Sequence, residues 1–279
     1  MKTVEYQTIV DAVAKLCIDG NYYLGEDVMN AFKKGLENEV SPTGKDILKQ
    51  LIENAEIAAN EQVPMCQDCG VGVVFLEIGQ DVKIEGGYIN DAITEGVIKG
   101  YADGYLRKSM CDPFTRKNTG NNAPAIIHTE IVPGEKLKIT VAPKGGGSEN
   151  MSAIAMMAPS AGIEGVKKFI IERVRQAGPN PCPPLLLGIG IGGNFEKSAI
   201  LAKKALLREI GVPSPIPEVA ELEKELLEKT NKLGVGPAGL GGKTTVLNVA
   251  IEYHPCHIAS FPVAVNINCH AARHKSIEF

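Results

Sequence analysis

The chain has 279 residues, a length compatible with one large domain or with two smaller ones. Lys and Arg number 29 against 33 Asp and Glu, so the formal net charge is −4, which excludes a strongly basic protein that binds nucleic acid mainly through phosphate contacts. With 5% aromatic residues and no tryptophan, base-stacking platforms and aromatic cages are not expected.

No apolar run is long enough to span a bilayer, because Gly and Pro interrupt the longest candidates. The N-terminal segment carries Glu5 and Asp11 inside its apolar pattern, which the hydrophobic core of a signal peptide would not contain. We therefore expect a cytoplasmic protein. The seven cysteines are widely spaced and odd in number, so metal binding or catalysis explains them better than a disulfide framework does.

The first 62 residues have the apolar spacing of helices, and two of these helices are expected over residues 27–38 and 46–60. From Gly70 the period changes to that of strands. Strands are expected over 71–79 and 81–87, and a helix over 90–108. A loop over 117–122 follows. Strands over 124–132 and 136–143 are joined by the turn residues Pro133 and Gly134.

The remaining chain is expected to alternate helices and strands. Helices are predicted from about Met151 and over 165–176, 195–209 and 217–232, and strands over 184–192, 244–253 and 261–268. This order indicates a mixed α/β (α+β) fold, with a helical N-terminal region followed by mixed sheets flanked by helices. We expect one catalytic domain over residues 1–279, open to a division into a helical part (1–62) and an α/β part (63–279).

The segment PMCQDCG, residues 64–70, places Cys66 and Cys69 at the spacing of a zinc or redox pair. A structural zinc site would need a second pair at short range, and a thioredoxin-like site would lie at the start of a helix, whereas Gly70 leads into a strand. Asp68 is a candidate for proton transfer if a metal lies beside it, and otherwise an ordinary solvated acid in a turn.

Three glycine-rich segments are candidates for ligand binding. KGGGSEN, residues 144–150, offers backbone amides to an anion such as a carboxylate. The run over 188–193 has the G-x-G-x-x-G spacing of a dinucleotide site, but no second strand ending in an acidic residue follows, so close helix–strand packing is the competing interpretation. GLGGKTT resembles a phosphate loop, but Pro237 occupies the position of its first glycine.

The C-terminal part is dense in histidine and cysteine. Four of the five histidines lie between His254 and the end, in the segments HPCHIAS and CHAARH. This density near strand ends indicates a functional site. In their order along the chain, PMCQDCG, KNTGNN, KGGGSEN, PCPP with GIGIGG, GLGGKTT and HIASFPVAVNINCHAARH make the sequence resemble the α subunit of the iron–sulfur class I fumarate hydratase and L-tartrate dehydratase family, over essentially its whole length.

The resemblance implies an active site built on an iron–sulfur cluster. Cys66, Cys182 and Cys269 would bind three irons of a 4Fe-4S cluster, and the fourth iron would face the substrate. Asp68 would be the acid/base residue. The residues implied to contact the dicarboxylate are Gln67, Arg107, Gly146 and His257.

Two departures from the family pattern matter. Position 69 is Cys where the family more often has Thr, so Cys69 is either a rival ligand or a thiol prone to oxidation, and the sequence does not decide whether Cys256 takes part in cluster binding. The chain also ends at Phe279, where single-chain relatives continue, so a β subunit of the same enzyme and an oligomeric assembly are expected. The expected activity is reversible hydration of fumarate to L-malate. L-tartrate dehydration, a dinucleotide-dependent oxidoreductase and a zinc-binding scaffold are the alternatives.

Overall fold

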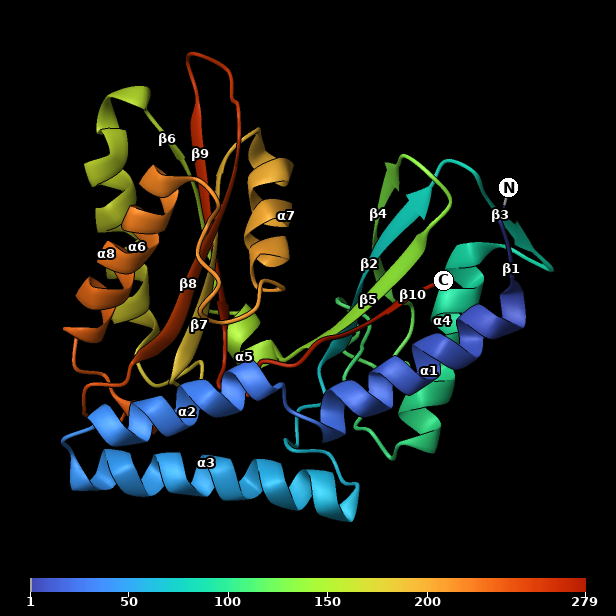
Figure 1. The fold of residues 1–279 in the computed structure, drawn as a ribbon, viewed down its shortest axis with the longest axis horizontal. Helices are drawn as coiled ribbons and strands as arrows, with labels where there is room; N and C mark the ends of the chain where they lie inside the picture. Colours follow the sequence, from blue (N-terminus) through green and yellow to red (C-terminus); the bar gives the residue numbers. More distant parts are fainter. Residues whose placement is uncertain (1) are drawn as a thin grey trace. The chain divides into compact units, whose positions relative to one another are not determined.

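A computed structural model describes residues 2–279, which form two compact units, each discontinuous in sequence (Figure 1). Of the described residues, unit 1 contains 2–25, 54–146 and 273–279, and unit 2 contains 26–53 and 147–272. Helices at the N-terminus followed by mixed sheets confirm the predicted fold class. The division at residue 62 expected from the sequence stays a prediction.

Unit 1 packs two helices, α1 (Tyr6–Tyr22) and α4 (Ile89–Asp103), against each other and α1 against a sheet. The two helices approach closely because α4 carries glycines at the contact. A Cβ atom on Gly96 would lie 2.7 Å from the carbonyl oxygen of Val10, and one on Gly100 would lie 2.6 Å from that of Ala14. Any larger residue would push the helices apart.

The four-stranded sheet of unit 1 has the order β10-β5-β2-β4. Its strands are β2 (Val71–Gly79), β4 (Ile126–Val132), β5 (Leu137–Lys144) and β10 (Lys275–Glu278); β1 (Lys2–Glu5) and β3 (Val82–Glu85) form a separate parallel pair. Pro133 and Gly134 join β4 to β5 as predicted, but β2 lies between them, parallel to β4 and antiparallel to β5. The apolar strand β2 is thus an inner strand of the sheet, as is β5.

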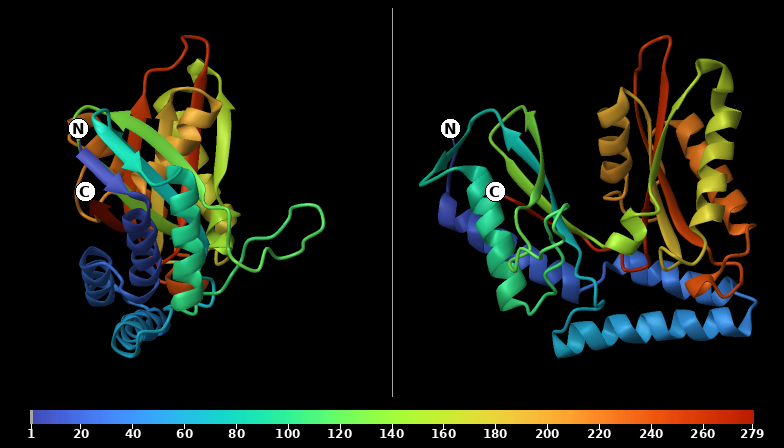
Figure 2. Two further views of the ribbon diagram at one scale, coloured as in Figure 1. Left: turned by 90° about the vertical axis from the view of Figure 1, so that its right-hand side faces the viewer. Right: turned by 180° about the vertical axis from the view of Figure 1, so that it is seen from behind.

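Unit 2 contains a sheet of order β6-β9-β7-β8, with α6 and α8 on one face and α7 on the other (Figures 1 and 2). The strands are β6 (Ala153–Met157), β7 (Leu185–Gly192), β8 (Val246–His254) and β9 (Phe261–Asn268). The helices are α2 (Glu26–Asn38), α6 (Gly162–Ala177), α7 (Phe195–Ala205) and α8 (Pro217–Asn231), with α3 (Pro42–Glu61) crossing the boundary at residue 53 and the one-turn α5 (Gly146–Glu149) crossing that at residue 146.

Most predicted elements are confirmed within a few residues, and two predictions are wrong. The helix expected from Met151 is the strand β6, because residues 153–157 pair with β9, and this long-range pairing overrides local preference. The helix expected over 90–108 ends at Asp103, so Arg107 lies beyond it in the loop that leads to β4. The short strands β1 and β10 were not expected.

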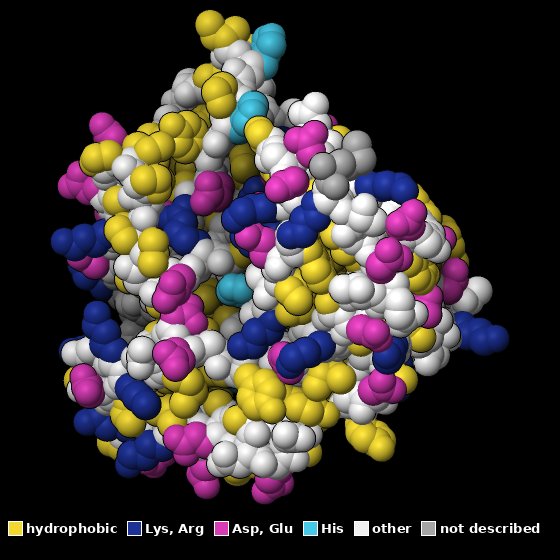
Figure 3. Space-filling model, turned by 45° about the vertical axis from the view of Figure 1, so that its right-hand side comes forward, with side chains coloured by type: hydrophobic (Ala, Val, Ile, Leu, Met, Phe, Trp, Pro, Cys, Tyr) yellow, Lys and Arg dark blue, Asp and Glu magenta, His cyan; other side chains and the backbone are white. Residues whose placement is uncertain are grey.

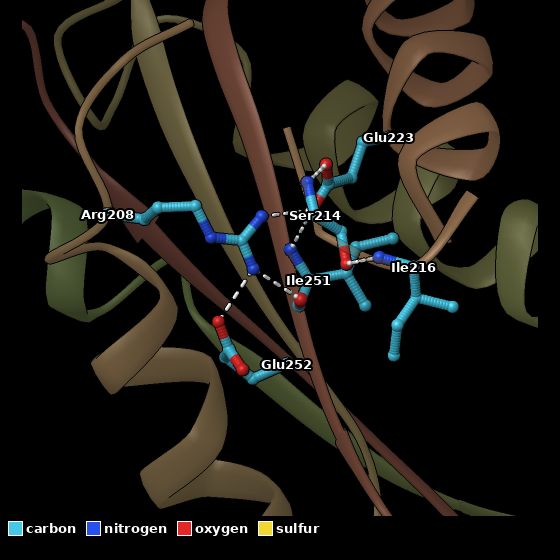
Figure 4. Close-up of polar contacts among 6 residues, drawn as sticks. All are labelled: Arg208, Ser214, Ile216, Glu223, Ile251 and Glu252. Carbon is cyan, nitrogen blue, oxygen red and sulfur yellow. Dashed lines mark hydrogen bonds and ion pairs between the residues drawn. The ribbon is translucent and has the colours of Figure 1, made fainter. Parts of the chain in front are cut away.

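The exposed edge of the unit 2 sheet is closed by an ion-pair network (Figure 4). Glu223 is buried and accepts hydrogen bonds from the backbone N–H of Ile251 at 2.8 Å and of Ser214 at 2.9 Å. Arg208 donates to the Ile251 carbonyl at 2.7 Å and pairs with Glu223 at 2.5 Å and with Glu252 at 2.6 Å. Both outward backbone groups of Ile251 are therefore satisfied by side chains, which blocks pairing with a further strand at this point.

Acidic and basic side chains are interspersed on the face drawn in Figure 3, in agreement with the small net charge. Among residues 2–279, no helix combines the length and apolar character needed to cross a membrane.

Candidate active site

The segment PMCQDCG forms a loop between α3 and β2 in unit 1. Its start is anchored through Met65, whose N–H donates to the carbonyl of Asn21 at 3.0 Å and whose carbonyl accepts from the side chain of Asn54 at 2.8 Å. Gln67 is exposed and Cys66 is partly exposed, with its thiol 3.3 Å from Oε1 of Gln67. The loop therefore presents the first predicted cluster ligand and a predicted substrate contact side by side.

Asp68 is held in this loop by two backbone amides. Gly70 N–H donates to Oδ1 at 3.0 Å, and Gly146 N–H donates to Oδ2 at 2.8 Å. A Cβ atom on Gly145 would lie 3.2 Å from Oδ2, so the glycine run allows the backbone to approach the carboxylate. The structure thus brings Asp68 and Gly146 together. The backbone N–H of Gly146, predicted to bind an anionic ligand, binds the protein's own Asp68 carboxylate.

Gly70 is required at the end of the loop. Its φ is +75°, and a Cβ atom there would lie between 2.7 and 2.9 Å from backbone atoms of Lys144. A larger residue would separate the loop from β5 and with it from the glycine segment that follows β5.

Cys69 is buried, unlike Cys66, and links the loop to the segment that carries Arg107. Its sulfur accepts a hydrogen bond from Arg107 N–H at 3.2 Å and donates to the carbonyl of Cys66 at 3.6 Å. Burial raises the pKa of the Cys69 thiol, against the lowering effect of the Arg107 N–H and of the Arg273 charge. The backbone of Arg107 is thereby fixed, while its side chain is exposed.

Cys182 and Cys269 come together at one end of the sheet in unit 2. Cys182 precedes β7 and Cys269 follows β9, and these strands are antiparallel neighbours in which Leu186 pairs with Asn268. The N–H of His270 donates to the Cys182 carbonyl at 3.3 Å, and its ring Nδ1 lies 3.0 Å from the same oxygen. Two of the three predicted cluster ligands therefore lie on adjacent loops.

His257 lies at the opposite end of that sheet, in the exposed loop between β8 and β9 (Figure 1). The eight residues of β9, at about 3.3 Å each, separate this end from Cys269 by roughly 25 Å. Ala259 N–H donates to Nδ1 of His257 at 3.1 Å, so the proton of the neutral imidazole is on Nε2. The structure does not bring His257 together with the two cysteines of its own unit.

The other glycine-rich segments have structural roles. A Cβ atom on Gly188 would lie 2.0 Å from the carbonyl oxygen of Ala202, and one on Gly190 equally close to that of Ser198, so both glycines allow α7 to pack on β7. In GLGGKTT, the amides of Lys243 and Thr244 each bind the carboxylate of Glu39 at 2.9 Å. An internal carboxylate occupies the amides that a phosphate loop would offer.

The three cysteines predicted to bind a cluster are divided between the two units. All seven cysteines are thiols, with Cys66 in unit 1 and Cys182 and Cys269 in unit 2. Within residues 2–279 no three His, Cys, Asp or Glu side chains lie close enough to hold a metal ion. Thiolates are the usual ligands of iron–sulfur clusters, and Cys182 and Cys269 offer two thiols on adjacent loops of unit 2.

Two residues that the sequence did not single out support the loop from within unit 1. The hydroxyl of Tyr101, fully buried, donates to the carbonyls of Cys69 at 2.7 Å and Gly70 at 3.0 Å. The guanidinium of Arg273, 4% exposed, donates to the carbonyl of Asp68. In the sequence, Arg273 could have been suspected because it lies in the motif CHAARH, whereas Tyr101 lies in none of the motifs.

Comparison with known proteins gives consistent relatives. Residues 10–278 match the family model "Fumarate hydratase (Fumerase)". The protein named "Putative L(+)-tartrate dehydratase subunit alpha" from Methanocaldococcus jannaschii is 47% identical over 271 residues, which is 95% of each chain. The L(+)-tartrate dehydratase subunit alpha of Escherichia coli O157:H7, and that of Escherichia coli K12, are each 35% identical over 255 residues, 89% of this chain and 83% of theirs.

Proposed function

This chain belongs to the fumarate hydratase family of hydro-lyases, and we propose that it is the α subunit of an iron–sulfur enzyme that adds water to, or removes it from, a four-carbon dicarboxylate. The observation that carries the proposal is that three separate segments of unit 1 are joined by hydrogen bonds. Asp68 of PMCQDCG accepts a hydrogen bond from the backbone N–H of Gly146 in KGGGSEN, and Cys69 of the same loop accepts one from the backbone N–H of Arg107.

Cys66, Cys182 and Cys269 would hold the 4Fe-4S cluster, because thiolates are the usual ligands of such clusters. Cys66 lies in the Asp68 loop, and the adjacent loops of Cys182 and Cys269 supply two more thiols. When bound, the cluster would supply a Lewis acid, at the iron that no cysteine holds, for the hydroxyl group that leaves or is added. Cys69 is buried and hydrogen-bonded to the backbone, which favours Cys66 as the ligand from this loop.

The protein's own residues would bind the substrate and move its proton. The exposed Arg107 side chain offers a two-pronged donor that matches a carboxylate, and the exposed Gln67 adds an amide group next to Cys66. A substrate carboxylate that takes the Gly146 amide would release Oδ2 of Asp68. That oxygen would then exchange a proton with the substrate carbon.

His257 requires a second copy of the chain to act at this site. It lies roughly 25 Å from Cys269 along β9, a distance far beyond the reach of its side chain. The histidine of one copy would therefore serve the site of another, and its Nε2–H would donate to a substrate carboxylate. A closed symmetric assembly would place each exposed β8–β9 loop in this way.

A β subunit would complete the enzyme. The tartrate dehydratase relatives described above are named as α subunits, and this chain covers more than four fifths of the length of each. We place the assembly in the cytoplasm, in keeping with the exposed thiols and with the pattern of the N-terminal segment.

The proposal is tested on the anaerobically purified complex of this chain with a β subunit encoded by the same organism. Fumarate consumption and L-malate formation are measured together with iron and labile sulfide content, and EPR is recorded after mild oxidation. We expect turnover and the signal of a three-iron cluster, which forms when the iron without a cysteine is lost. A complex that contains zinc, no labile sulfide and no hydro-lyase activity would exclude the proposal.

L(+)-tartrate is the second candidate substrate, because the relatives at 47% and 35% identity are named as tartrate dehydratase subunits. Fumarate remains the first choice on the family description. The ratio of kcat/KM for L-malate and L(+)-tartrate, measured on one preparation, decides between the two.

A further inference from the structure

The side chain of Asn122 connects two segments of the candidate site. Asn122 belongs to KNTGNN, is fully buried, and has a φ of +60°. Its Nδ2 donates to the carbonyl of Gly70 at 3.1 Å, and its Oδ1 accepts from the backbone N–H of Ser109 at 2.7 Å and of Met110 at 3.1 Å. One amide group thus uses its donor on the Asp68 loop and its acceptor on the segment just after Arg107.

Asn122 lies at the base of the long loop that joins α4 to β4, seen projecting from unit 1 in Figure 2 (left panel). Farther out, Cys111 and Asn118 form a single β-bridge, and Phe114 is 92% exposed. The contacts of Asn122 with Ser109 and Met110 close the loop at its base. Arg107 enters the loop two residues before this closure, so its backbone direction depends on it.

The residue type suits this position. An asparagine side chain donates and accepts at the same time, whereas Asp only accepts and Ser is too short to span both partners. Asparagine also tolerates a positive φ better than most residues do. The neighbouring Asn118 and Asn121 differ from Asn122, because Asn118 is exposed and Asn121 only receives the amide of Ala123 two residues away.

We propose that Asn122 is a positioning residue that sets Arg107 relative to Asp68 for the hydro-lyase reaction, an inference that rests on the proposed function. It shares this task with Cys69, whose sulfur binds the Arg107 amide directly. Both backbone groups of Gly70 take part in these contacts. Its carbonyl accepts hydrogen bonds from the side chains of Asn122 and Tyr101, and its N–H donates to the Asp68 carboxylate. A shift of Asn122 would move the proton-transfer group and the carboxylate-binding group apart.

The test uses the complete complex with its β subunit and three variants. N122G keeps a backbone that accepts a positive φ but removes all three hydrogen bonds, whereas N122D keeps the acceptor for Ser109 and Met110 and removes the donor to Gly70. N121A is the matched control. It removes a neighbouring asparagine side chain that accepts the N–H of Ala123 and takes no part in the contacts of Asn122 with Gly70, Ser109 and Met110.

Steady-state kinetics and hydrogen–deuterium exchange are measured on each. For N122G we expect KM to rise and kcat to fall by about tenfold or more each, because small displacements of positioned groups have large effects on rate. Amide exchange should become faster both at residues 66–70 and at 109–110. N122D should keep the protection of 109–110 and lose that of Gly70. N121A should leave both kinetic constants within about twofold of wild type.

Normal kinetics and unchanged exchange in N122G would overturn the assignment. Loss of activity with kcat alone affected and without faster exchange at 109–110 would also overturn it, because Arg107 would then be unaffected. If the wild-type complex has no hydro-lyase activity, the proposed function fails on its own account. The exchange data then show whether Asn122 links residues 66–70 to residues 109–110. If exchange in N122G is unchanged in these two segments, the inference is overturned. If N122G does not fold, N122D decides by the same criteria.

Discussion

The backbone N–H of Gly146 donates to Oδ2 of Asp68 at 2.8 Å, across 78 residues of sequence. With Gly70 N–H on Oδ1, each oxygen of the Asp68 carboxylate accepts one hydrogen bond from the backbone. The contact joins the glycine segment to the loop of Asp68, the proposed acid/base residue. It also means that a ligand binding to the Gly146 amide has to displace Asp68, so substrate binding and proton transfer would be coupled at this one amide.

The first prediction concerns Asp68. D68N should keep the iron and sulfide of the wild-type complex but lower turnover by roughly 10²–10⁴-fold, because an amide cannot accept or donate the substrate proton. Turnover and iron content are measured on the same preparation. D112N, which alters an exposed carboxylate in the α4–β4 loop, is the control and should turn over normally. Unchanged turnover in D68N would remove Asp68 from the mechanism.

The cysteines are expected to differ in cluster retention. C182S should lose most of the iron and sulfide, because a cluster held by three thiolates loses one ligand. C111S should retain both, since Cys111 lies in the projecting loop. C69S should also retain the cluster, because a hydroxyl group can replace the thiol between Arg107 N–H and the Cys66 carbonyl. Equal iron loss in C182S and C111S would contradict the ligand assignment.

Complementation between two inactive chains tests the placement of His257. If each site takes its histidine from another copy, co-expressed H257A and D68N chains form mixed assemblies in which one site has both wild-type groups. In a random dimeric mixture, about a quarter of wild-type activity should return. Either variant alone should stay inactive. Activity no higher than that of the two single variants would place His257 in the site of its own chain or outside the site altogether.

Glu39 is expected to make stability depend on pH below the physiological range. Burial raises its pKa, but hydrogen bonds from the amides of Lys243, Ser41, Thr244 and Val40 have the larger combined effect and lower the pKa to about 2. Because the folded-state pKa is depressed, the stabilisation is complete above the unfolded pKa of about 4.5 and is lost as the pH falls from there toward 2.

E39Q should lower the free energy of unfolding at pH 7 by about 1–3 kcal/mol, as expected for hydrogen bonds to a buried charged group. The difference from wild type should shrink as the pH is lowered from 5 to 3. Urea unfolding at several pH values measures it. E37Q, which alters an exposed carboxylate in α2 two residues before Glu39, is the control. A wild-type to E39Q difference that is constant over this range would show that the Glu39 charge does not contribute.

The sequence by itself determined most helices and strands, because their apolar periodicity and their turn residues are local properties. It also determined which motifs belong together, through a resemblance that the family match over residues 10–278 bears out. Its errors came where distant segments decide the structure. Residues 153–157 form β6 because β9 pairs with them, and β2 separates two strands that are consecutive in sequence.

Only the tertiary structure decided how the motifs are used. The amides of GLGGKTT bind Glu39, the glycines of GIGIGG admit α7, and Asn122 joins Gly70 to the Arg107 segment. His257 and Cys269 are twelve residues apart in sequence, yet an extended strand places them at opposite ends of a sheet. Spacing along a chain does not give distance in space, because an extended strand carries the chain away by about 3.3 Å with each residue while strand pairing and buried hydrogen bonds bring remote segments together.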